Sequence, residues 1–426
     1  MTDSASPIRW FRDSSPYINA HRNKTFVVVL SESSLTGPNI GNIVTDLALL
    51  QSLGIKLVIV LGDEGMMADL PVRHADRAIV RPEDLDACKA AIGRMSTDLK
   101  ARFSVGLINS PMHGADITVV SGNFVRARPL GIIDGVDHHN TGETRRVNKG
   151  AILGQLAQGA VVLLPPIGYS PTGETFILDG NALAQQAAIA IGASKLIYYV
   201  DAPGVLDGAG SLVSELQANQ VDDRDGPFTA SPFSHLLAFT AEACRRGVSR
   251  CHLISESEDG ALLVELFTRD GTGTQVVLQS YESLRDATVD DVAAILALIE
   301  PLQLEGVLVA RSRELIESEI DRFIVIERDG LIIGCAALYP FAGAGELACL
   351  AIHPDYRNGD RGERLLAAIE HRARGLELAQ LFALSTKTSA WFQEHGFRSG
   401  EITELPAERQ SALDTARNSR LLVKTL

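Results

Sequence analysis

The N-terminal part of the chain alternates short apolar runs with segments of helical periodicity. Residues 25–30 (TFVVVL) and 55–62 (IKLVIVLG) are apolar at nearly every position, as in strands buried on both faces of a parallel sheet. Between them, Ile43, Leu47 and Leu50 recur at the spacing of one face of a helix. This alternation continues over about 250 residues, which predicts an open, mostly parallel α/β sheet with helices on both faces.

Later stretches of this region supply further predicted elements. The pattern predicts strands at 161–164, 195–200 and 249–254 and helices at 181–191 and 232–246. Residues 116–131 (DITVVSGNFVRARPLG) have the character of a β-hairpin, and we expect a hairpin there.

The pattern changes near residue 280, where a second domain is expected to begin. Thr288 is followed three residues later by Asp291, the spacing of a capping box before an apolar helix. Residues 323–341 (FIVIERDGLIIGCAALYPF) predict a β-hairpin that turns at Asp329-Gly330. A strand, a loop, a helix, a strand, a short helix and a last strand follow. The last ~145 residues therefore predict a smaller α+β domain.

Charge and cysteine content narrow the classes of function. The 426 residues include 39 Lys and Arg against 53 Asp and Glu, so the net charge is −14. Nucleic-acid-binding and polybasic membrane proteins need a cationic surface, so neither kind of partner is expected. The five cysteines are scattered without a CxxC pair, which predicts buried free thiols rather than a disulfide framework or a zinc site.

The chain has no recognisable targeting or membrane-spanning segment. Residues 1–17 lack the apolar stretch of a secretory signal. No apolar run approaches the ~20 residues that are needed to cross a bilayer. We therefore expect a cytoplasmic protein, in a compartment where thiols stay reduced.

Residues 349–369 (CLAIHPDYRNGDRGERLLAAI) form the most specific local pattern. A strand runs into a loop that contains Arg357, Gly359, Arg361 and Gly362, and a helix begins directly behind it. Backbone N–H groups at a helix N-terminus together with two arginines make an anion site that suits a pyrophosphate. The alternative is an ordinary strand-to-helix turn whose glycines serve geometry alone.

This segment resembles the GCN5-related N-acetyltransferase family, in which the loop after the central strand follows the pattern R-x-x-G-x-G/A. The resemblance covers about residues 283–426 and includes the ending WFQEHGF. It implies that the loop holds the pyrophosphate of acetyl-CoA, although Asp360 stands where the pattern has its first glycine. The implied acetyl-CoA contacts are Leu350, Ala351, Ile352, Arg357, Asn358, Gly359, Asp360, Arg361, Gly362 and Glu363.

Nearly the whole chain resembles the bacterial N-acetylglutamate synthase family. The matching segments, in order, are VVSGNF, PLG, DGVD, CHLISESEDGALLVELFTRDGTGTQ, GVLVARSRELIE, GELACLAIHPDYR and ARNSRLLVKTL. The resemblance implies an N-terminal helical arm (1–24), an amino-acid-kinase-like regulatory domain (25–280) and an acetyltransferase domain (283–426). It also implies transfer of acetyl from acetyl-CoA to the α-amine of L-glutamate, the first step of arginine biosynthesis.

The resemblance assigns catalytic groups to this reaction. Attack of an amine on a thioester needs a base, an oxyanion donor and a proton for the leaving thiolate. Glu346 resembles the general base, acting directly or through a water, and Ser385 resembles the proton donor. The backbone N–H of Leu350 or Ile352 is the expected oxyanion donor. The alternatives are a solvated strand-end carboxylate for Glu346 and a turn or helix-capping hydroxyl for Ser385.

Glutamate presents two carboxylates, for which guanidinium groups are natural partners. By resemblance, Arg311 and Arg417 hold these carboxylates together with Ser419, and backbone groups near Cys349 contribute. The alternative for any single arginine is a surface salt bridge.

The resemblance to arginine-sensitive relatives implies L-arginine as an inhibitor that binds the N-terminal domain. His252, Glu265, Gly271 and Gly273 are implied to line its site, with Glu265 pairing with the guanidinium or the α-amino group. Tyr17 belongs to the arm, which in the family closes over the effector and interlaces with a neighbouring subunit. A homo-oligomeric ring, a hexamer, follows from the same resemblance. The alternative is that His252 and Glu265 are ordinary polar residues at a domain edge.

The first loops of the N-terminal domain differ from those of a kinase. A phosphoryl-transfer site needs Gly-rich turns and a lysine, whereas acidic Glu32, Asp63 and Glu64 occupy these loops. We therefore expect no kinase activity. The pair His138-His139 is expected to be an ordinary loop pair, so no metal site is expected. Two other functions stay open, namely an acetyltransferase for another amino acid and a catalytically inactive arginine-sensing subunit.

Overall fold

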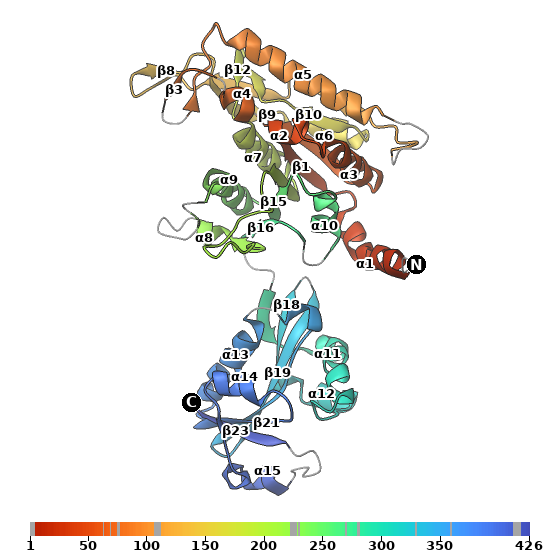
Figure 1. Cartoon of the computed structure of the whole chain (residues 1–426), viewed down its shortest axis with the longest axis vertical. Coiled ribbons are helices and arrows are strands. Elements are labelled where there is room, and N and C mark those ends of the chain that lie inside the picture. Colours follow the sequence, from red (N-terminus) through yellow and green to blue (C-terminus); the bar gives the residue numbers. More distant parts are fainter. Residues whose placement is uncertain are drawn as a thin grey trace. The chain divides into compact units, whose positions relative to one another are not determined.

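The computed structural model forms two compact units, Met1–Ser280 and Tyr281–Leu426 (Figure 1). Each unit has its own sheet and its own hydrophobic core. The structure describes residues 5–62, 64–68, 70–74, 77–105, 112–221, 228, 231–268, 271–278, 282–328, 330–357, 360–411 and 419–426.

Strand β1 (Thr25–Leu30) lies inside the eight-stranded sheet of the first unit. It pairs in parallel with β2 (Lys56–Leu61) on one side and with β13 (Lys195–Val200) on the other. The order is β14-β16-β15-β13-β1-β2-β10-β5, and β15 and β16 pair antiparallel. The remaining strands span Glu215–Gln217 (β14), Thr274–Val277 (β16), Arg250–Ser255 (β15), Val161–Leu164 (β10) and Val119–Val120 (β5). The sheet is open and mostly parallel, as the hydrophobic pattern predicts.

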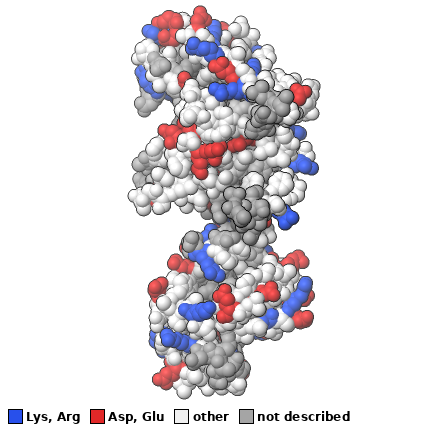
Figure 2. Space-filling model, turned by 45° about the vertical axis from the view of Figure 1, so that its right-hand side comes forward, with Lys and Arg blue, Asp and Glu red and all other residues white. Residues whose placement is uncertain are grey.

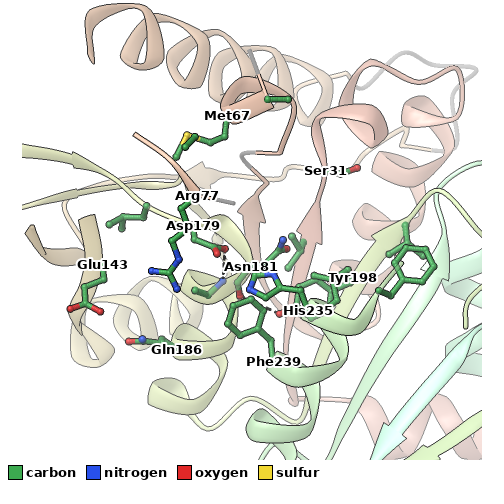
Figure 3. Close-up of a pocket in the computed structure, with 18 of the residues that line it drawn as sticks. Ser31, Met67, Arg77, Glu143, Asp179, Asn181, Gln186, Tyr198, His235 and Phe239 are labelled. Atoms are coloured by element: carbon green, nitrogen blue, oxygen red, sulfur yellow. Dashed lines mark hydrogen bonds between the residues drawn. The ribbon is translucent and has the colours of Figure 1, made fainter. Parts of the chain in front are cut away.

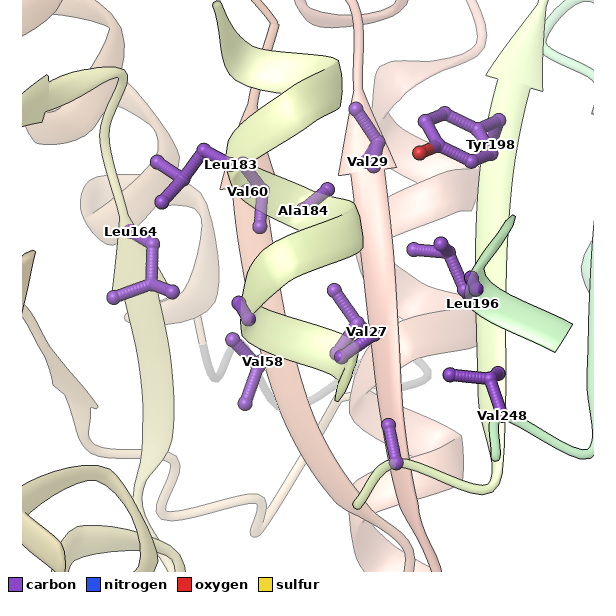
Figure 4. Close-up of a cluster of buried hydrophobic side chains, with 14 of the residues drawn as sticks. Val27, Val29, Val58, Val60, Leu164, Leu183, Ala184, Leu196, Tyr198 and Val248 are labelled. Atoms are coloured by element: carbon purple, nitrogen blue, oxygen red, sulfur yellow. The ribbon is translucent and has the colours of Figure 1, made fainter. Parts of the chain in front are cut away.

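Both faces of this sheet are buried, because alternate side chains of each strand point to opposite sides. Val27 and Val29 of β1 face helix α7 in the cluster drawn in Figure 4. Val28 points to the other side and packs in the cluster that contains helices α3 and α10. Fully burying one such side chain stabilises the fold by about 1.5–3 kcal/mol. These helices span Gly180–Ile191 (α7), Ile40–Ser52 (α3) and Ala261–Phe267 (α10).

A second, four-stranded sheet of this unit has the order β12-β11-β6-β9. Its β6 (Val125–Pro129) pairs with β9, whereas β5 belongs to the main sheet beside β10. The hairpin predicted for residues 116–131 is therefore wrong, because local alternation identifies half-buried strands but not their partners. The other strands are β3 (Arg73–His74), β4 (Arg77–Ala78), β7 (Ile132–Ile133), β8 (Val136–Asp137), β9 (Gly142–Val147), β11 (Ile167–Tyr169) and β12 (Thr175–Ile177). The other helices are α1 (Ala5–His21), α2 (Glu32–Thr36), α4 (Glu64–Ala68), α5 (Leu85–Phe103), α6 (Lys149–Ala157), α8 (Ala218–Val221) and α9 (Ser234–Arg245).

The second unit is a seven-stranded sheet of order β17-β18-β19-β20-β21-β23-β22. Helices α13 and α11 belong to separate core clusters, to which alternate residues of β18 contribute. Its strands are β17 (Glu282–Asp286), β18 (Phe323–Arg328), β19 (Leu331–Phe341), β20 (Ala344–Ile352), β21 (Gln380–Ser385), β22 (Arg398–Ser399) and β23 (Arg420–Thr425). Its α-helices are α11 (Val292–Leu304), α12 (Arg313–Ser318), α13 (Arg361–Gly375), α14 (Ser389–Glu394) and α15 (Ala407–Ser411).

Local signals in the second unit are confirmed. Thr288 and Asp291 form the predicted capping box, and β18 and β19 form the predicted hairpin. Gly330 has φ 78°, the left-handed conformation that its turn position requires. Asp329 lies outside the described residues.

Helix α5 is the main element that the prediction omits. It has 19 residues, and Cys88, Ile92, Leu99 and Phe103 are buried along it at helical spacing. The periodic signal is thus present, although these apolar positions are diluted by many polar ones.

Lys and Arg side chains are interspersed with Asp and Glu on the face drawn in Figure 2. All five cysteines are buried free thiols, as predicted. No helix in the part of the chain that the structure describes is long and apolar enough to span a membrane.

Candidate active site

Strand β20 carries Glu346 at the point where its pairing with β21 stops. The two strands pair in parallel from Ala344 to Glu346, and the described register ends there. On the other side of the strand, Glu346 lies opposite Tyr339 of β19. The Glu346 side chain is largely buried, which does not fit the alternative of a solvated strand-end carboxylate.

The backbone of β20 changes direction three residues beyond Glu346. Cys349 has φ 53°, a left-handed conformation that is uncommon for residues with a side chain. Beyond it, Ala351 and Ile352 pair with β19 and have no described partner in β21. This edge of β20 therefore has backbone groups that a ligand can bind, including the segment around Leu350.

Arg311 joins Glu346 and Cys349 in one cluster. Its guanidinium carbon lies 5.3 Å from the ring centre of Tyr339. Burial lowers the pKa of the Arg311 guanidinium, but Cys349, Tyr339 and Glu346 outweigh this and raise it. Burial raises the pKa of the Cys349 thiol to about 11, against an opposing effect of Arg311. The Arg311 cation thus stands near the Glu346 carboxylate and the Cys349 thiol.

Sequence reasoning missed two residues of this cluster, Tyr339 and Arg409. Tyr339 donates its hydroxyl to Glu319 at 2.9 Å, and the hairpin register that places it opposite Glu346 would have revealed it. Arg409 of α15 binds Glu346 through two hydrogen bonds of 2.6 and 3.0 Å. No local pattern predicts that contact, because the two residues are 63 positions apart.

Ser385 ends β21 and is buried. Its Oγ accepts the backbone N–H of Thr388 at 2.9 Å and lies 2.8 Å from the Thr388 hydroxyl. This is the contact of a turn hydroxyl, since Thr388 and not Ser385 is the N-cap residue of α14. A hydroxyl that accepts a hydrogen bond still has its own proton to donate. Ser419 is half-buried before β23, and Arg417 lies outside the described residues.

The loop before α13 only partly matches the predicted anion site. Asp360 is the N-cap of α13 but makes no side-chain hydrogen bond to the helix, so its carboxylate does not occupy the first-turn N–H groups. Arg361 is committed elsewhere, since its Nε donates to Glu282 at 2.9 Å. Asn358 and Gly359 lie outside the described residues.

The remaining loop residues are placed around the start of α13. Arg357 is exposed, with its Nε 3.4 Å from the Ile352 carbonyl oxygen. A Cβ on Gly362 would lie 3.1 Å from the Trp391 ring. Any larger residue at this position would therefore require the Trp391 ring to shift slightly. Glu363 Oε1 lies 3.3 Å from His395 Nε2.

His252 and Glu265 form a buried network in the first unit. Lys195 Nζ lies 3.1 Å from His252 Nε2, and His252 Nδ1 lies 2.6 Å from Glu265 Oε1. Glu265 Oε2 accepts the N–H groups of Thr272 and Gly273 at 2.8 and 2.9 Å. Burial and then Lys195 lower the pKa of His252 to about 4. Burial raises the pKa of Glu265, but the opposing effects of His252 and the two N–H groups are larger together and bring the pKa down to about 2.

Helix α1 packs close to this network. His21 Nε2 lies 2.9 Å from the carbonyl oxygen of Leu266 in α10, the helix that carries Glu265. Tyr17 packs, partly buried, on the cluster that includes α10. Gly271 has φ 65° and lies beside the Glu265 carboxylate. The residues expected for an effector site thus lie on neighbouring segments.

A separate cavity of about 890 Å³ lies at the carboxyl ends of β1, β13 and β15 (Figure 3). Glu256 in its wall accepts hydrogen bonds from the hydroxyls of Ser31, Ser33 and Ser34 at 2.8, 3.0 and 2.7 Å. The cations of its described lining are Arg73 and Arg77, with no lysine among them. A kinase would use a lysine to neutralise the transferring phosphoryl group. Other lining residues include Asp179, Asn181, His235 and Phe239.

Comparison with known proteins identifies both units. Residues 24–255 match the Amino acid kinase family. Residues 319–399 match the Acetyltransferase (GNAT) domain.

Similarity to individual proteins extends over nearly the full length. The amino-acid acetyltransferase of Azotobacter vinelandii is 49% identical over 98% of this chain and 99% of its own. That of Pseudomonas putida is 48% identical with the same coverage. The N-acetylglutamate synthase of Neisseria gonorrhoeae complexed with coenzyme A and L-arginine matches with a TM-score of 0.84 and 36% identity, over 98% of this chain and 99% of that one. The same synthase complexed with coenzyme A and N-acetyl-glutamate matches with a TM-score of 0.62 and 35% identity, with the same coverage. The chain therefore belongs to the amino-acid acetyltransferases of the N-acetylglutamate synthase family, enzymes that join an amino-acid-kinase-like domain to a GNAT domain.

Proposed function

We propose that this enzyme transfers the acetyl group of acetyl-CoA to the α-amine of L-glutamate, which yields N-acetyl-L-glutamate and CoA as the first step of arginine biosynthesis. The full-length similarity to a synthase solved with coenzyme A and with N-acetyl-glutamate is the observation that carries this proposal. The cluster of Arg311 and Glu346 beside the unpaired edge of β20 supports it.

Glu346 is the proposed general base. It takes a proton from the glutamate ammonium, directly or through one water, and the neutral amine attacks the thioester carbon. A backbone N–H of Leu350 or Ile352 donates to the oxyanion that forms. The new C–N bond is kept when the C–S bond breaks, and the nitrogen loses its extra proton to solvent. Ser385 passes its hydroxyl proton to the departing thiolate and takes a replacement proton from water.

Arg311 is the proposed partner of one glutamate carboxylate, with Arg417 and Ser419 at the other. Arg311 is partly buried and already neighbours Glu346 and Cys349, so an acceptor bound there has its amine close to the base. Backbone groups at the Cys349 kink supply further hydrogen bonds.

Acetyl-CoA is proposed to bind along β20 and at the start of α13. The unpaired edge of β20 from Leu350 to Ile352 suits its amide-bearing arm, and the N-terminus of the 15-residue α13 suits its pyrophosphate. Of the two loop arginines, the exposed Arg357 fits the pyrophosphate role better, because Arg361 binds Glu282.

L-Arginine is proposed to inhibit from the first unit, at the site of Tyr17, His252, Glu265, Gly271 and Gly273. The ionised Glu265 carboxylate, with its pKa near 2, provides the charge that a guanidinium or an ammonium needs. The Neisseria synthase solved with L-arginine supports a separate effector site.

A hexameric ring and a cytoplasmic location complete the proposal. Helix α1 exposes Ile8 (55%), Trp10 (46%) and Phe11 (63%), an apolar surface that a neighbouring subunit would cover. Five buried free thiols are consistent with a reducing compartment.

Release of CoA thiol tests the proposed reaction. The purified enzyme is mixed with acetyl-CoA and with L-glutamate, L-aspartate or L-glutamine, each with and without L-arginine. We expect glutamate to give the highest kcat/KM and the variant Glu346→Gln to lower kcat by ~10²-fold or more. A preference for another acceptor would indicate a different amino-acid acetyltransferase, and no release with any acceptor would indicate a sensing subunit.

A further inference from the structure

The contact between Glu346 and Arg409 joins the proposed base to a segment that is distant in sequence. Arg409 Nε donates to Oε2 of Glu346 at 2.6 Å, and its Nη2 donates to Oε1 at 3.0 Å. The two side chains are only 18% and 11% exposed. A planar guanidinium therefore engages both carboxylate oxygens in a largely dehydrated place, where such a pair fixes orientation most strongly.

The turn that carries Arg409 is anchored on the strands of the candidate site. Leu405, just before α15, is buried in a cluster with Ala344 of β20 and Phe382 of β21. Gln410 Nε2 donates to the Leu405 carbonyl oxygen at 2.7 Å, and the N–H of Arg409 donates to the Pro406 carbonyl oxygen at 2.9 Å. The guanidinium is thus delivered from a turn fixed to β20, which carries Glu346, and to β21, which carries Ser385.

We infer that Arg409 is a positioning residue for acetyl transfer, which directs the Glu346 carboxylate toward the acceptor amine. This inference rests on the proposed function, in which Glu346 is the base. An ionised carboxylate has about four lone-pair sites, so a bidentate arginine leaves two for the amine or for a bridging water. A reacting group displaced by ~1 Å loses ~10²-fold in rate, so a fixed carboxylate matters for kcat.

Three other roles for Arg409 give different kinetics. A purely structural salt bridge would change stability but not kcat. An arginine that bound the acceptor carboxylate would change the KM for glutamate. If Arg409 instead blocked the base in the free enzyme, removal of Arg409 would raise kcat/KM.

A double-mutant cycle on the full-length enzyme separates these roles. The enzymes are the parent, Glu346→Gln, Arg409→Gln and the double variant, with Arg409→Lys as the conservative change. Arg398→Gln is the matched control, because Arg398 lies in the same part of the chain and pairs with Glu404 at the surface, 61% exposed. Initial rates of CoA release give kcat and KM, and urea unfolding checks each fold.

We expect Arg409→Gln to lower kcat by ~10²-fold and to change the KM for glutamate less than about threefold. In the Glu346→Gln background the same change should have no further effect on kcat, because a positioning residue acts only through its partner. Arg409→Lys keeps the positive charge but cannot donate two parallel hydrogen bonds to the carboxylate, so it should recover part of the rate. Arg398→Gln should behave like the parent.

A parent-like kcat in folded Arg409→Gln would overturn the inference. The inference would also be overturned if the losses of kcat in the two single variants added up in the double variant. A change in Arg409→Gln that affects only KM, or that raises kcat/KM, would overturn it as well. If Arg409→Gln does not fold, Arg409→Lys replaces it in the cycle. A smaller loss of kcat is then expected, and it should again vanish in the Glu346→Gln background. A parent enzyme that releases no CoA with glutamate contradicts the proposed function instead, which distinguishes the two failures.

Discussion

Arg311 is the single side chain on which acceptor recognition is expected to depend most. It is partly buried beside Tyr339, Cys349 and Glu346. If its side chain is removed, water cannot bind the glutamate carboxylate there as strongly as the guanidinium does. We expect Arg311→Ala to weaken kcat/KM for glutamate by about 2–4 kcal/mol. Arg313→Ala, an exposed neighbour at the start of α12, is the control. An unchanged KM for glutamate in Arg311→Ala would contradict the assignment.

Asp46 on α3 makes the stability of the first unit depend on pH. Burial, with a further effect of Asp259, raises the pKa of Asp46 from 3.8 to about 7. Between these values the native state holds a proton that the unfolded chain releases, so this group favours folding at acidic pH. The advantage is full below pH 3.8 and is lost progressively as pH rises to about 7, above which the native state must bury a charge.

Asp46→Asn should therefore stabilise the protein by an amount that grows as pH rises from about 4 to about 7 and is constant above that. We expect a gain of about 2 kcal/mol in the free energy of unfolding at pH 8, after discounting the full pKa shift for residual solvent screening, and roughly a third of that gain at pH 5. Urea denaturation at both pH values measures it. Asp86→Asn, whose side chain is 94% exposed, is the control. Equal effects of Asp46→Asn at pH 5 and pH 8 would exclude this role.

Strand β20 has a kink at Cys349, where the backbone adopts a conformation that is unfavourable for residues with a side chain. Cys349 is buried at φ 53°, a conformation that is more costly still for a β-branched side chain. We expect Cys349→Val to be less stable than Cys349→Ala by about 1–3 kcal/mol in urea unfolding. The KM for acetyl-CoA should rise in the same order, because the kink sets the course of the unpaired edge that follows. Equal stability of the two variants would mean that the kink is not under strain.

Arginine control is expected to need both helix α1 and the Glu265 network. Deletion of residues 1–23 and the change Glu265→Gln should each relieve inhibition of CoA release by arginine and leave arginine-free activity largely intact. The exposed Glu258→Gln is the control for a nearby carboxylate. If both altered enzymes stay as arginine-sensitive as the parent, the effector site lies elsewhere.

Assembly should depend on the same helix. Light scattering of the full-length enzyme is expected to give six copies of the 45.7 kDa chain. Deletion of residues 1–23 should give smaller species, because it removes the exposed apolar side chains of Ile8, Trp10 and Phe11. A full-length monomer would contradict the ring, and an unchanged mass after deletion would assign assembly to other surfaces.

Much of the fold was predictable because its signals are local. The strands at 25–30, 161–164 and 195–200 occur with the predicted ends, since continuous apolar runs describe strands buried on both faces. The capping box at Thr288 and the hairpin turn at Gly330 likewise depend on neighbours only a few residues away. The candidate site was predictable because long segments match the family in the same order along the chain. That resemblance placed Glu346 and Arg311 in one domain.

Contacts between distant segments were decided by the tertiary structure. Apolar alternation at 116–131 marks strands but not partners, so β5 and β6 pair in different sheets. Arg361, one of the two arginines predicted at the pyrophosphate site, binds Glu282, which lies 79 positions away. Glu346 meets Arg409 only because α15 is anchored beside β20. Periodicity records which face of an element is buried, whereas the partner of a charge depends on which segments the packed core brings together.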